Sequence, residues 1–229
     1  MLHFDPYYFL WIAPALILAF VAQAMVHSAY AHAKQVPARM SGMAASRLIL
    51  DASGLQDVAI EQIPGTLSDH YDPRAKVLRL SQDIYHGRSL AAVGIAAHEA
   101  GHALQDAHNY PLMAIRNLAV PLANFGGSIG MVVIFAGVGL GLQSVAILGL
   151  ILFSGTAFFQ LVNLPVEFDA SNRAKRLLIE QGIVDEQEMP EVRRVLRAAA
   201  LTYVAATLQS VLLVAYYASR ILGNGRNDR

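Results

Sequence analysis

The chain alternates long stretches without a formal charge with shorter polar segments. Residues 6–33 contain no Asp, Glu, Lys or Arg, residues 117–166 continue this pattern for 50 positions, and residues 198–219 form a third such stretch. A helix of about 20 mostly apolar residues crosses roughly 30 Å of hydrocarbon. The pattern therefore predicts four membrane helices, with the 50-residue stretch folded as a hairpin, at residues 7–26, 118–140, 144–164 and 198–219.

The first of these helices has a second interpretation, a cleaved signal peptide. No basic residue precedes it, and Asp5 does. Its apolar stretch is also long for a signal peptide. Tyr7, Tyr8 and Trp11 at its start are typical of aromatic residues at a membrane interface. These features favour a retained N-terminal anchor.

The two polar segments predict secondary structure outside the lipid. Residues 42–53 have the pattern of a helix that Gly54 ends. Residues 57–63 and 76–80 alternate apolar and polar side chains, which predicts strands of a small β-ribbon or sheet. The stretch between them, residues 64–73, is rich in turn residues.

A helical run over residues 166–180 follows the hairpin and is closed by Gly182. Pro165 suits the first turn of that helix. A further helix is predicted to begin near Pro190 and to run into the last apolar stretch. We expect five successive parts: an anchor (1–33), a first polar segment (34–116), a membrane hairpin (117–165), a second polar segment (166–197), and a C-terminal membrane helix with its tail (198–229).

Composition agrees with a membrane protein and excludes several other classes. Hydrophobic residues make up 55% of the chain and charged residues 15%, and mean hydropathy is +0.41. The absence of cysteine excludes disulfide frameworks, thiolate catalysis and Cys-type zinc sites. The formal net charge is zero and no basic stripe is present, so we expect no nucleic-acid partner.

Basic residues are distributed unevenly between the loops. Eight lie in residues 34–116 and six in residues 173–197, whereas the turn of the hairpin has none. The positive-inside rule therefore predicts that both polar segments face the cytoplasm. The three arginines from Arg220 onward oppose this topology, but the two large segments outnumber them. No predicted span contains a charged residue, which argues against a transporter.

The sequence His98-Glu99-Ala100-Gly101-His102 is an HExxH pattern within an apolar, helix-compatible run over residues 89–108. Residues four apart share one helix face, so both imidazoles can bind the same metal ion with Glu99 beside them. Glu99 then suits the role of general base for a zinc-activated water. Gly101 lowers helix stability against alanine, which indicates a close approach by another element.

Two histidines merely packed on an apolar helix are the alternative, and a third ligand would favour the metal site. Two predicted membrane crossings separate His102 from Glu167, so the two residues return to the same side. Glu167 also lies where the second hairpin helix leaves the apolar region. A carboxylate there can complete a His₂Glu zinc site with one zinc ion per chain.

Longer stretches resemble a known family, the YugP-like neutral zinc metallopeptidases of bacterial membranes. The resemblance covers nearly the full chain and is carried by residues 67–74, 78–81, 98–105 and 164–171, which read LSDHYDPR, LRLS, HEAGHALQ and LPVEFDAS. It implies a zinc-dependent peptidase with His98 and His102 as ligands and Glu99 as base. By likeness to membrane gluzincins of the HtpX type, it supports Glu167 as third ligand.

The chain departs from the gluzincin pattern at one position. Gluzincins usually carry an aspartate four residues after the glutamate ligand, and here that residue is Ser171. Asp169 would face elsewhere on a regular helix. The candidates for orienting a zinc-bound histidine are Asp106, Ser171 and Asn172.

The residue that stabilises the transition state, or contacts substrate, also remains open among several candidates. For residues 69–73 a plain turn is the simpler interpretation, and packing at the surface is the simpler one for the others. The candidates are His70, Tyr71, His108, Tyr110 and Arg173.

Together these features predict a mainly α-helical integral membrane protein with about four transmembrane helices and a cytosol-facing, zincin-like catalytic domain that carries a small β-ribbon or sheet. The expected function is a zinc endopeptidase of the bacterial inner membrane. Its expected partners are the lipid bilayer and membrane-associated or misfolded protein substrates. A zinc-dependent scaffold without turnover is the alternative. Such a scaffold needs the ligands but not the base Glu99, which is present.

Overall fold

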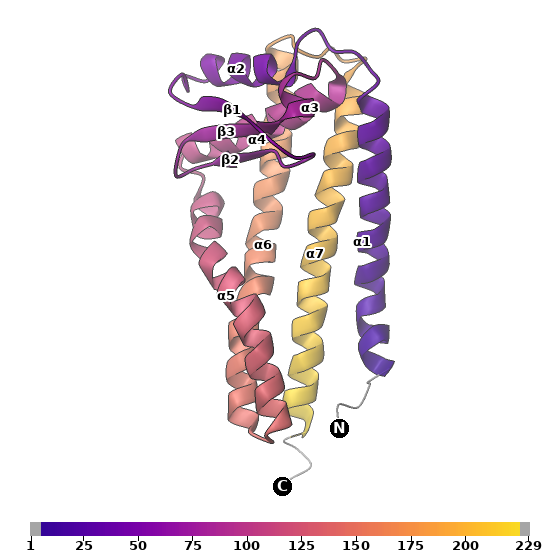
Figure 1. Cartoon of the computed structure of the whole chain (residues 1–229), viewed down its shortest axis with the longest axis vertical. Coiled ribbons are helices and arrows are strands. Elements are labelled where there is room, and N and C mark those ends of the chain that lie inside the picture. Colours follow the sequence, from indigo (N-terminus) through magenta and orange to yellow (C-terminus); the bar gives the residue numbers. More distant parts are fainter. Residues whose placement is uncertain (1–5, 225–229) are drawn as a thin grey trace. The chain divides into compact units, whose positions relative to one another are not determined.

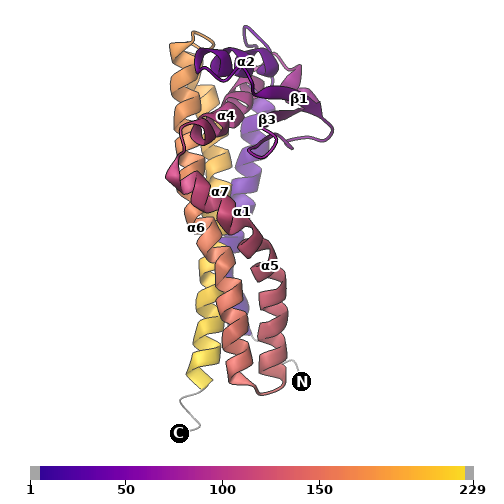
Figure 2. The same cartoon turned by 90° about the vertical axis from the view of Figure 1, so that its left-hand side faces the viewer.

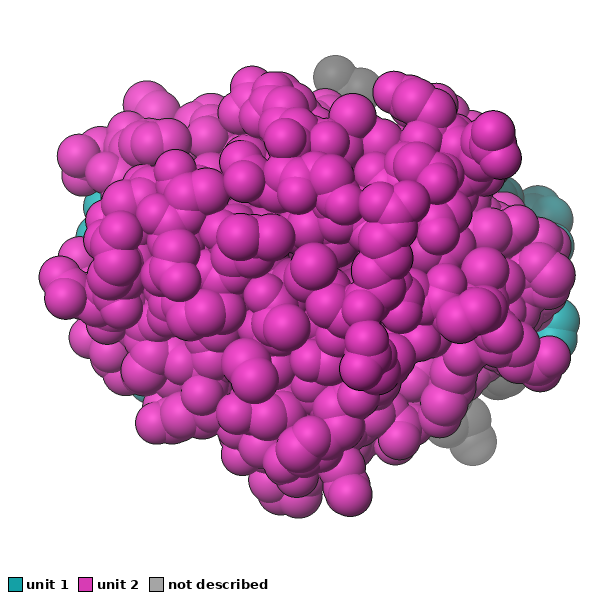
Figure 3. Space-filling view, turned by 90° about the horizontal axis from the view of Figure 1, so that it is seen from above, with its two compact units in different colours: residues 1–21, 114–165, 202–229 teal, residues 22–113, 166–201 magenta. Residues whose placement is uncertain are grey.

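The computed structural model describes residues 6–224 and is mostly helical (Figure 1). The elements in chain order are α1 (Pro6–Ala33), α2 (Gly42–Ala52), β1 (Ala59–Ile63), β2 (His70–Asp72), β3 (Val77–Ser81), α3 (Gln82–Tyr85), α4 (Leu90–Ala107), α5 (Pro111–Gly139), α6 (Gln143–Glu180) and α7 (Met189–Asn224). They form two compact units, coloured separately in Figure 3. Unit 1 comprises residues 1–21, 114–165 and 202–229, and unit 2 comprises residues 22–113 and 166–201.

Four helices among the described residues are long and apolar enough to cross a membrane: α1, α5, α6 and α7. This agrees with the four spans predicted from the charge-free stretches. Unit 1 contains much of their apolar length, and Phe20, Leu118 and Phe125 are among its exposed large side chains. Exposed apolar surface of this kind is stable in lipid and unfavourable in water.

Within unit 1, glycines allow α5 and α6 to approach closely. A Cβ atom added at Gly130 would lie 2.6 Å from the Phe153 nitrogen of α6. Gly126 likewise faces the Leu152 backbone. Small residues at such positions let membrane helices pack backbone against backbone. These glycines therefore account for the close contact of α5 with α6.

The predicted start of a new helix at Pro165 is wrong, because α6 runs without a break from Gln143 to Glu180 (Figures 1 and 2). Pro165 lies inside it. Membrane helices tolerate an internal proline, whose missing N–H leaves one carbonyl to be satisfied otherwise. Glu167 is therefore carried by the same helix that forms the second arm of the membrane hairpin.

Unit 2 contains a three-stranded sheet in the order β1-β3-β2. The two predicted strands, β1 and β3, pair in parallel, so the small sheet is the alternative that the structure has. β2 pairs antiparallel with β3 and occupies part of the stretch predicted as a turn. Tyr71 of β2 is buried, and Asp72 forms an ion pair with Arg79 of β3 at 2.7 Å. This burial and pairing explain why residues 70–72 form a strand.

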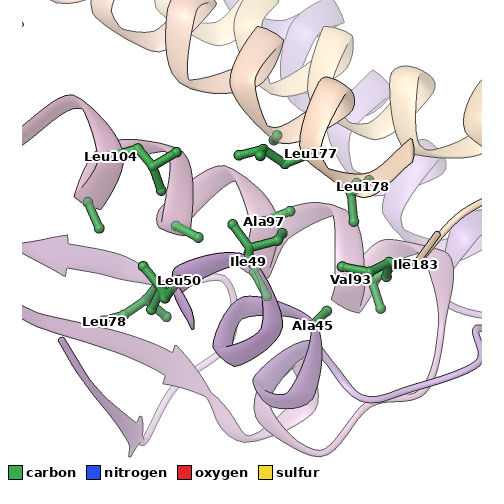
Figure 4. Close-up of a cluster of buried hydrophobic side chains, with 14 of the residues drawn as sticks. Ala45, Ile49, Leu50, Leu78, Val93, Ala97, Leu104, Leu177, Leu178 and Ile183 are labelled. Atoms are coloured by element: carbon green, nitrogen blue, oxygen red, sulfur yellow. The ribbon is translucent and has the colours of Figure 1, made fainter. Parts of the chain in front are cut away.

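The core of unit 2 surrounds α4. Leu50 of α2 and Leu78 of β3 pack against one side of this helix, and Leu177 and Leu178 of α6 pack against the other, as Figure 4 shows. Ser41 caps the N-terminus of α2, and Gly54 follows the helix with a φ of 75°. The predicted helix ended by Gly54 is thus confirmed. The resulting core fixes α4 on both sides.

Candidate metal centre

α4 begins and is held where the sequence predicts. Ser89 caps its N-terminus by accepting a hydrogen bond from the Ala92 amide at 3.2 Å. The helix is rich in alanine, which favours helix formation and lets neighbouring elements approach closely. His98 and His102 are one helical turn apart on this rigid support, with ring centroids separated by 4.8 Å.

Gly101 brings α6 up to α4. A Cβ atom at this position would lie 2.7 Å from the carbonyl oxygen of Ala170, closer than side chains pack in folded proteins. A side chain here would push the two helices apart, so the predicted need for a close approach at Gly101 is confirmed. Ala170 lies one turn after Glu167, and the contact therefore sets how near the Glu167 carboxylate comes to the histidines.

The three predicted ligands meet in unit 2. Glu167 Oε2 lies 3.2 Å from His98 Nε2 and 3.5 Å from His102 Nε2. One ligand atom from each of the three residues falls within a group no wider than 4.8 Å. The side chains of His98, His102 and Glu167 retain only 13%, 10% and 4% exposure. Residues 69 positions apart in sequence thus form one buried cluster.

The donor set fits a divalent cation such as zinc. Two imidazole nitrogens and a carboxylate oxygen converge on the same point, and a buried cluster of this kind requires positive charge. A proton on an imidazole or a metal ion can supply it. Burial by itself lowers the pKa of His102, but hydrogen bonding to Glu167 and its charge outweigh burial and raise it. The proton and the metal therefore compete for the same nitrogen.

Glu99 is buried beside this cluster, on the same helix. Burial raises its pKa, while the charges of His98 and His102 act in the opposite direction. A carboxylate with a raised pKa next to a metal centre is suited to accept a proton near neutral pH.

Two of the three candidates for orienting the histidines form no hydrogen bond with them among the residues that the structure describes. The third, Ser171, stands where gluzincins usually carry an aspartate. Its Oγ lies 3.1 Å from Nδ1 of the predicted ligand His98. Asp106 instead accepts a hydrogen bond from the Tyr71 hydroxyl at 2.8 Å. Asn172 is exposed on α6 and has no hydrogen bond to either histidine.

The sequence interpretation missed Gln105, which is fully buried on α4. Its Oε1 lies 2.9 Å from His102 Nδ1, and its Nε2 donates to Asp169 Oδ2 at 2.8 Å. Gln105 thus links Asp169 to His102 by two hydrogen bonds. The conspicuous signal for this role was the position of Gln105, three residues after His102 and on the same helix face.

The five candidates for substrate contact or transition-state stabilisation lie in unit 2, and none of them forms a hydrogen bond or ion pair with His98, Glu99, His102 or Glu167 in the described part of the chain. Arg173 of α6 pairs with Asp169 at 2.6 Å and donates to His108 Nδ1 at 3.2 Å. Its guanidinium also lies over the Tyr110 ring, 5.8 Å from the centroid. The three candidates His108, Tyr110 and Arg173 thus form one cluster.

The other two candidates belong to β2. The His70 ring is exposed and lies 2.9 Å from the Ser68 carbonyl oxygen. Tyr71 is buried, and burial together with the bond to Asp106 raises the pKa of its hydroxyl. Burial and the hydrogen bond to Asp106 thus hold the Tyr71 side chain in place on the strand.

Comparison with known proteins gives a consistent match over most of the chain. A family model described as "Putative neutral zinc metallopeptidase" matches residues 8–221. The "Putative membrane protease YugP" of Bacillus subtilis (strain 168) is 44% identical over 222 residues, which cover 96% of this chain and 98% of the relative. No solved structure is significantly similar to the chain.

Proposed function

The chain belongs to the neutral zinc metallopeptidase family, and we propose that it is a membrane-embedded endopeptidase whose zinc ion is held by His98, His102 and Glu167. The observation that carries this proposal is the convergence of two imidazole nitrogens and one carboxylate oxygen within 4.8 Å. These three residues would hold the ion and would leave one of its positions open for water, as hydrolytic zinc sites require.

Glu99 supplies the acid-base step of the proposed reaction. When bound, zinc provides Lewis-acid activation of a water molecule. Glu99 accepts the proton that this water releases as its oxygen bonds to the peptide carbonyl carbon. It then passes the proton to the amine as the carbon–nitrogen bond breaks. The burial of Glu99, which raises its pKa, supports this exchange of one proton.

We propose membrane-associated or misfolded proteins as substrates. Glu167 is the first charged residue after the charge-free stretch of residues 117–166. It lies on α6, which also carries the second half of that stretch. A ligand at this position supports cleavage near the membrane surface. β2 is an edge strand that contacts α4, so its free edge can bind an extended peptide by main-chain hydrogen bonds.

Cleavage of a membrane-tethered model substrate tests the function. Glu99→Gln keeps the shape of the side chain and removes the base, so we expect zinc binding to persist and kcat to fall at least about 10²-fold. A chelator abolishes the activity, and added zinc restores it to wild-type protein only. Cleavage by Glu99→Gln at the wild-type rate would contradict the peptidase proposal. If neither protein cleaves any substrate while loss of a ligand disrupts a complex, the scaffold alternative is favoured.

We further propose that the zinc site faces the cytoplasm of a bacterial inner membrane. Support comes from the lysines and arginines, eight in residues 34–116 and six in residues 173–197, against none in the α5–α6 turn. A reporter that works only in the cytoplasm should be active when inserted near Gly54 or Gly182. The same reporter should be inactive at Gly141. Activity at Gly141 would contradict the proposed topology.

A further inference from the structure

Gln105 is a fully buried amide that takes no part in the proposed chemistry. It lies on α4, three residues after His102 and therefore on the same side of the helix. A buried side-chain amide is stable only when its donors and its acceptor have partners. The identity of these partners determines which way the amide must point.

The two partners of Gln105 Nε2 orient the amide group. Nε2 lies 2.8 Å from the Val166 carbonyl oxygen and 2.8 Å from Asp169 Oδ2. A carbonyl oxygen can only accept a hydrogen bond. Asp169 Oδ2 is also an acceptor here, because Arg173 Nε, which can only donate, points its N–H at the same oxygen at 2.6 Å. The group that faces both oxygens must be the NH₂ group.

The orientation of the amide in turn determines the tautomer of His102. Gln105 Oε1 then faces His102 Nδ1 at 2.9 Å. An amide oxygen cannot donate, so the proton of this hydrogen bond belongs to Nδ1. In the neutral imidazole the lone pair is then on Nε2, the nitrogen that lies 3.5 Å from Glu167 Oε2.

We propose that Gln105 is a positioning residue that holds His102 in its Nδ1-protonated form, with Nε2 free to bind zinc, and that Asp169 and Arg173 orient Gln105 for this role. The proposal rests on the proposed zinc site. Through Gln105, Asp169 acts on a zinc ligand as the usual gluzincin aspartate does, but with a neutral amide between the carboxylate and the imidazole.

His98 differs from His102 in this respect. Its Nδ1 lies 3.1 Å from the Ser171 hydroxyl, and a hydroxyl can either donate or accept. Ser171 therefore leaves the tautomer of His98 open, whereas Gln105 imposes that of His102. Loss of the Gln105 amide should accordingly free the tautomer of His102 and leave that of His98 unchanged.

The full-length protein with Gln105→Met tests the proposal by zinc affinity. Methionine keeps a similar length but lacks the amide, and loss of such a partner typically weakens metal binding about 10- to 100-fold. Gln62→Met is the matched control, because Gln62 Oε1 also lies 2.7 Å from a histidine, His86 Nε2, at an exposed site away from the cluster. We expect competition with a chelator to give a zinc affinity within about twofold of wild type for this control. Equal zinc affinity of Gln105→Met and wild type would overturn the proposal.

A second measurement needs no substitution at Gln105. NMR of the zinc-loaded wild-type protein labelled with ¹⁵N-histidine reports which ring nitrogen of each imidazole carries a proton. We expect a proton on Nδ1 and zinc on Nε2 of His102. Zinc on Nδ1 of His102 would overturn the proposal even if Gln105→Met does not fold. If wild-type protein binds no zinc at all, the proposed function fails instead, and the two failures are thus distinguishable.

Discussion

α6 makes a close contact with another helix in each compact unit, and the two contacts serve different ends. In unit 1 it packs against α5, where a Cβ atom at Gly130 would lie 2.6 Å from the Phe153 nitrogen. In unit 2 it packs against α4, where a Cβ atom at Gly101 would lie 2.7 Å from the Ala170 oxygen. The steric requirement for glycine is therefore almost the same in both.

The side chains around the two contacts differ. Near Gly130 the packed residues are apolar, with Ile134, Leu150 and Phe153 in one cluster. Near Gly101, by contrast, Glu167 and Ser171 of α6 lie within hydrogen-bond distance of His98, and Asp169 accepts from Gln105. An apolar contact can relax at modest cost, but metal binding requires distances correct to about 0.2 Å. The contact in unit 2 therefore tolerates less displacement.

The largest effect is expected for Gly101→Ala. The added methyl group meets backbone, which cannot rotate away, so α4 and α6 must separate and carry Glu167 away from the histidines. We expect zinc affinity to fall at least tenfold, with a matching loss of proteolysis. Chelator competition measures the affinity directly.

Gly130→Ala is the matched control for this substitution. It imposes a similar steric overlap in unit 1, so thermal unfolding should show a cost of about 1–3 kcal/mol. Zinc affinity should stay within about twofold of wild type. If both variants lost zinc equally, the distinction between the two contacts would be wrong.

A smaller effect, the pH dependence of zinc affinity, is expected only at the contact in unit 2. Hydrogen bonding to Glu167 raises the pKa of His102 above its ordinary value despite burial, so the proton competes with zinc from a higher pH than usual. Zinc affinity should fall as the pH drops through this raised pKa, by up to tenfold per pH unit for each proton bound.

The stability of the metal-free protein depends on pH in the opposite direction: it rises as the pH falls. A raised pKa in the folded state stabilises the protein fully below the unfolded-state pKa of about 6.5, and this stabilisation is lost as the pH rises through the folded pKa. Unfolding of the zinc-free protein between pH 5 and 8 measures the effect. This pH dependence of stability should disappear in Glu167→Gln. An unchanged pH dependence in that variant would show that Glu167 does not raise the pKa of His102.

Local patterns predicted much of the fold. The four spans follow from charge-free stretches, α2 follows from the apolar spacing of residues 42–53 and its end at Gly54, and α4 follows from the helix-compatible run over residues 89–108. β2 did not follow, because three residues within a turn-rich stretch are held as a strand by the burial of Tyr71 and the Arg79 ion pair. The new helix expected at Pro165 was wrong, because α6 continues through this proline at the cost of one backbone hydrogen bond.

The site divides in the same way. His98, Glu99 and His102 could be identified from spacing within one helix, and Glu167 required an argument about topology and a family resemblance. The contact of Gln105 with His102 has a local signal, the spacing of three residues, but its hydrogen bonds to Val166 and Asp169, more than 60 residues away in sequence, could not be predicted. Ser171 was one candidate among three, and only the packing of α6 on α4 distinguishes it from Asn172.

Zinc content of the purified protein tests the central claim most directly. Wild-type protein should contain about one zinc ion per chain, and Glu167→Ala should lose it, because two histidines alone do not complete a tetrahedral site. Glu180→Ala, on the exposed end of the same helix, is the control and should retain zinc. Full zinc occupancy in Glu167→Ala would contradict the claim that α6 supplies the third ligand to the histidines of α4.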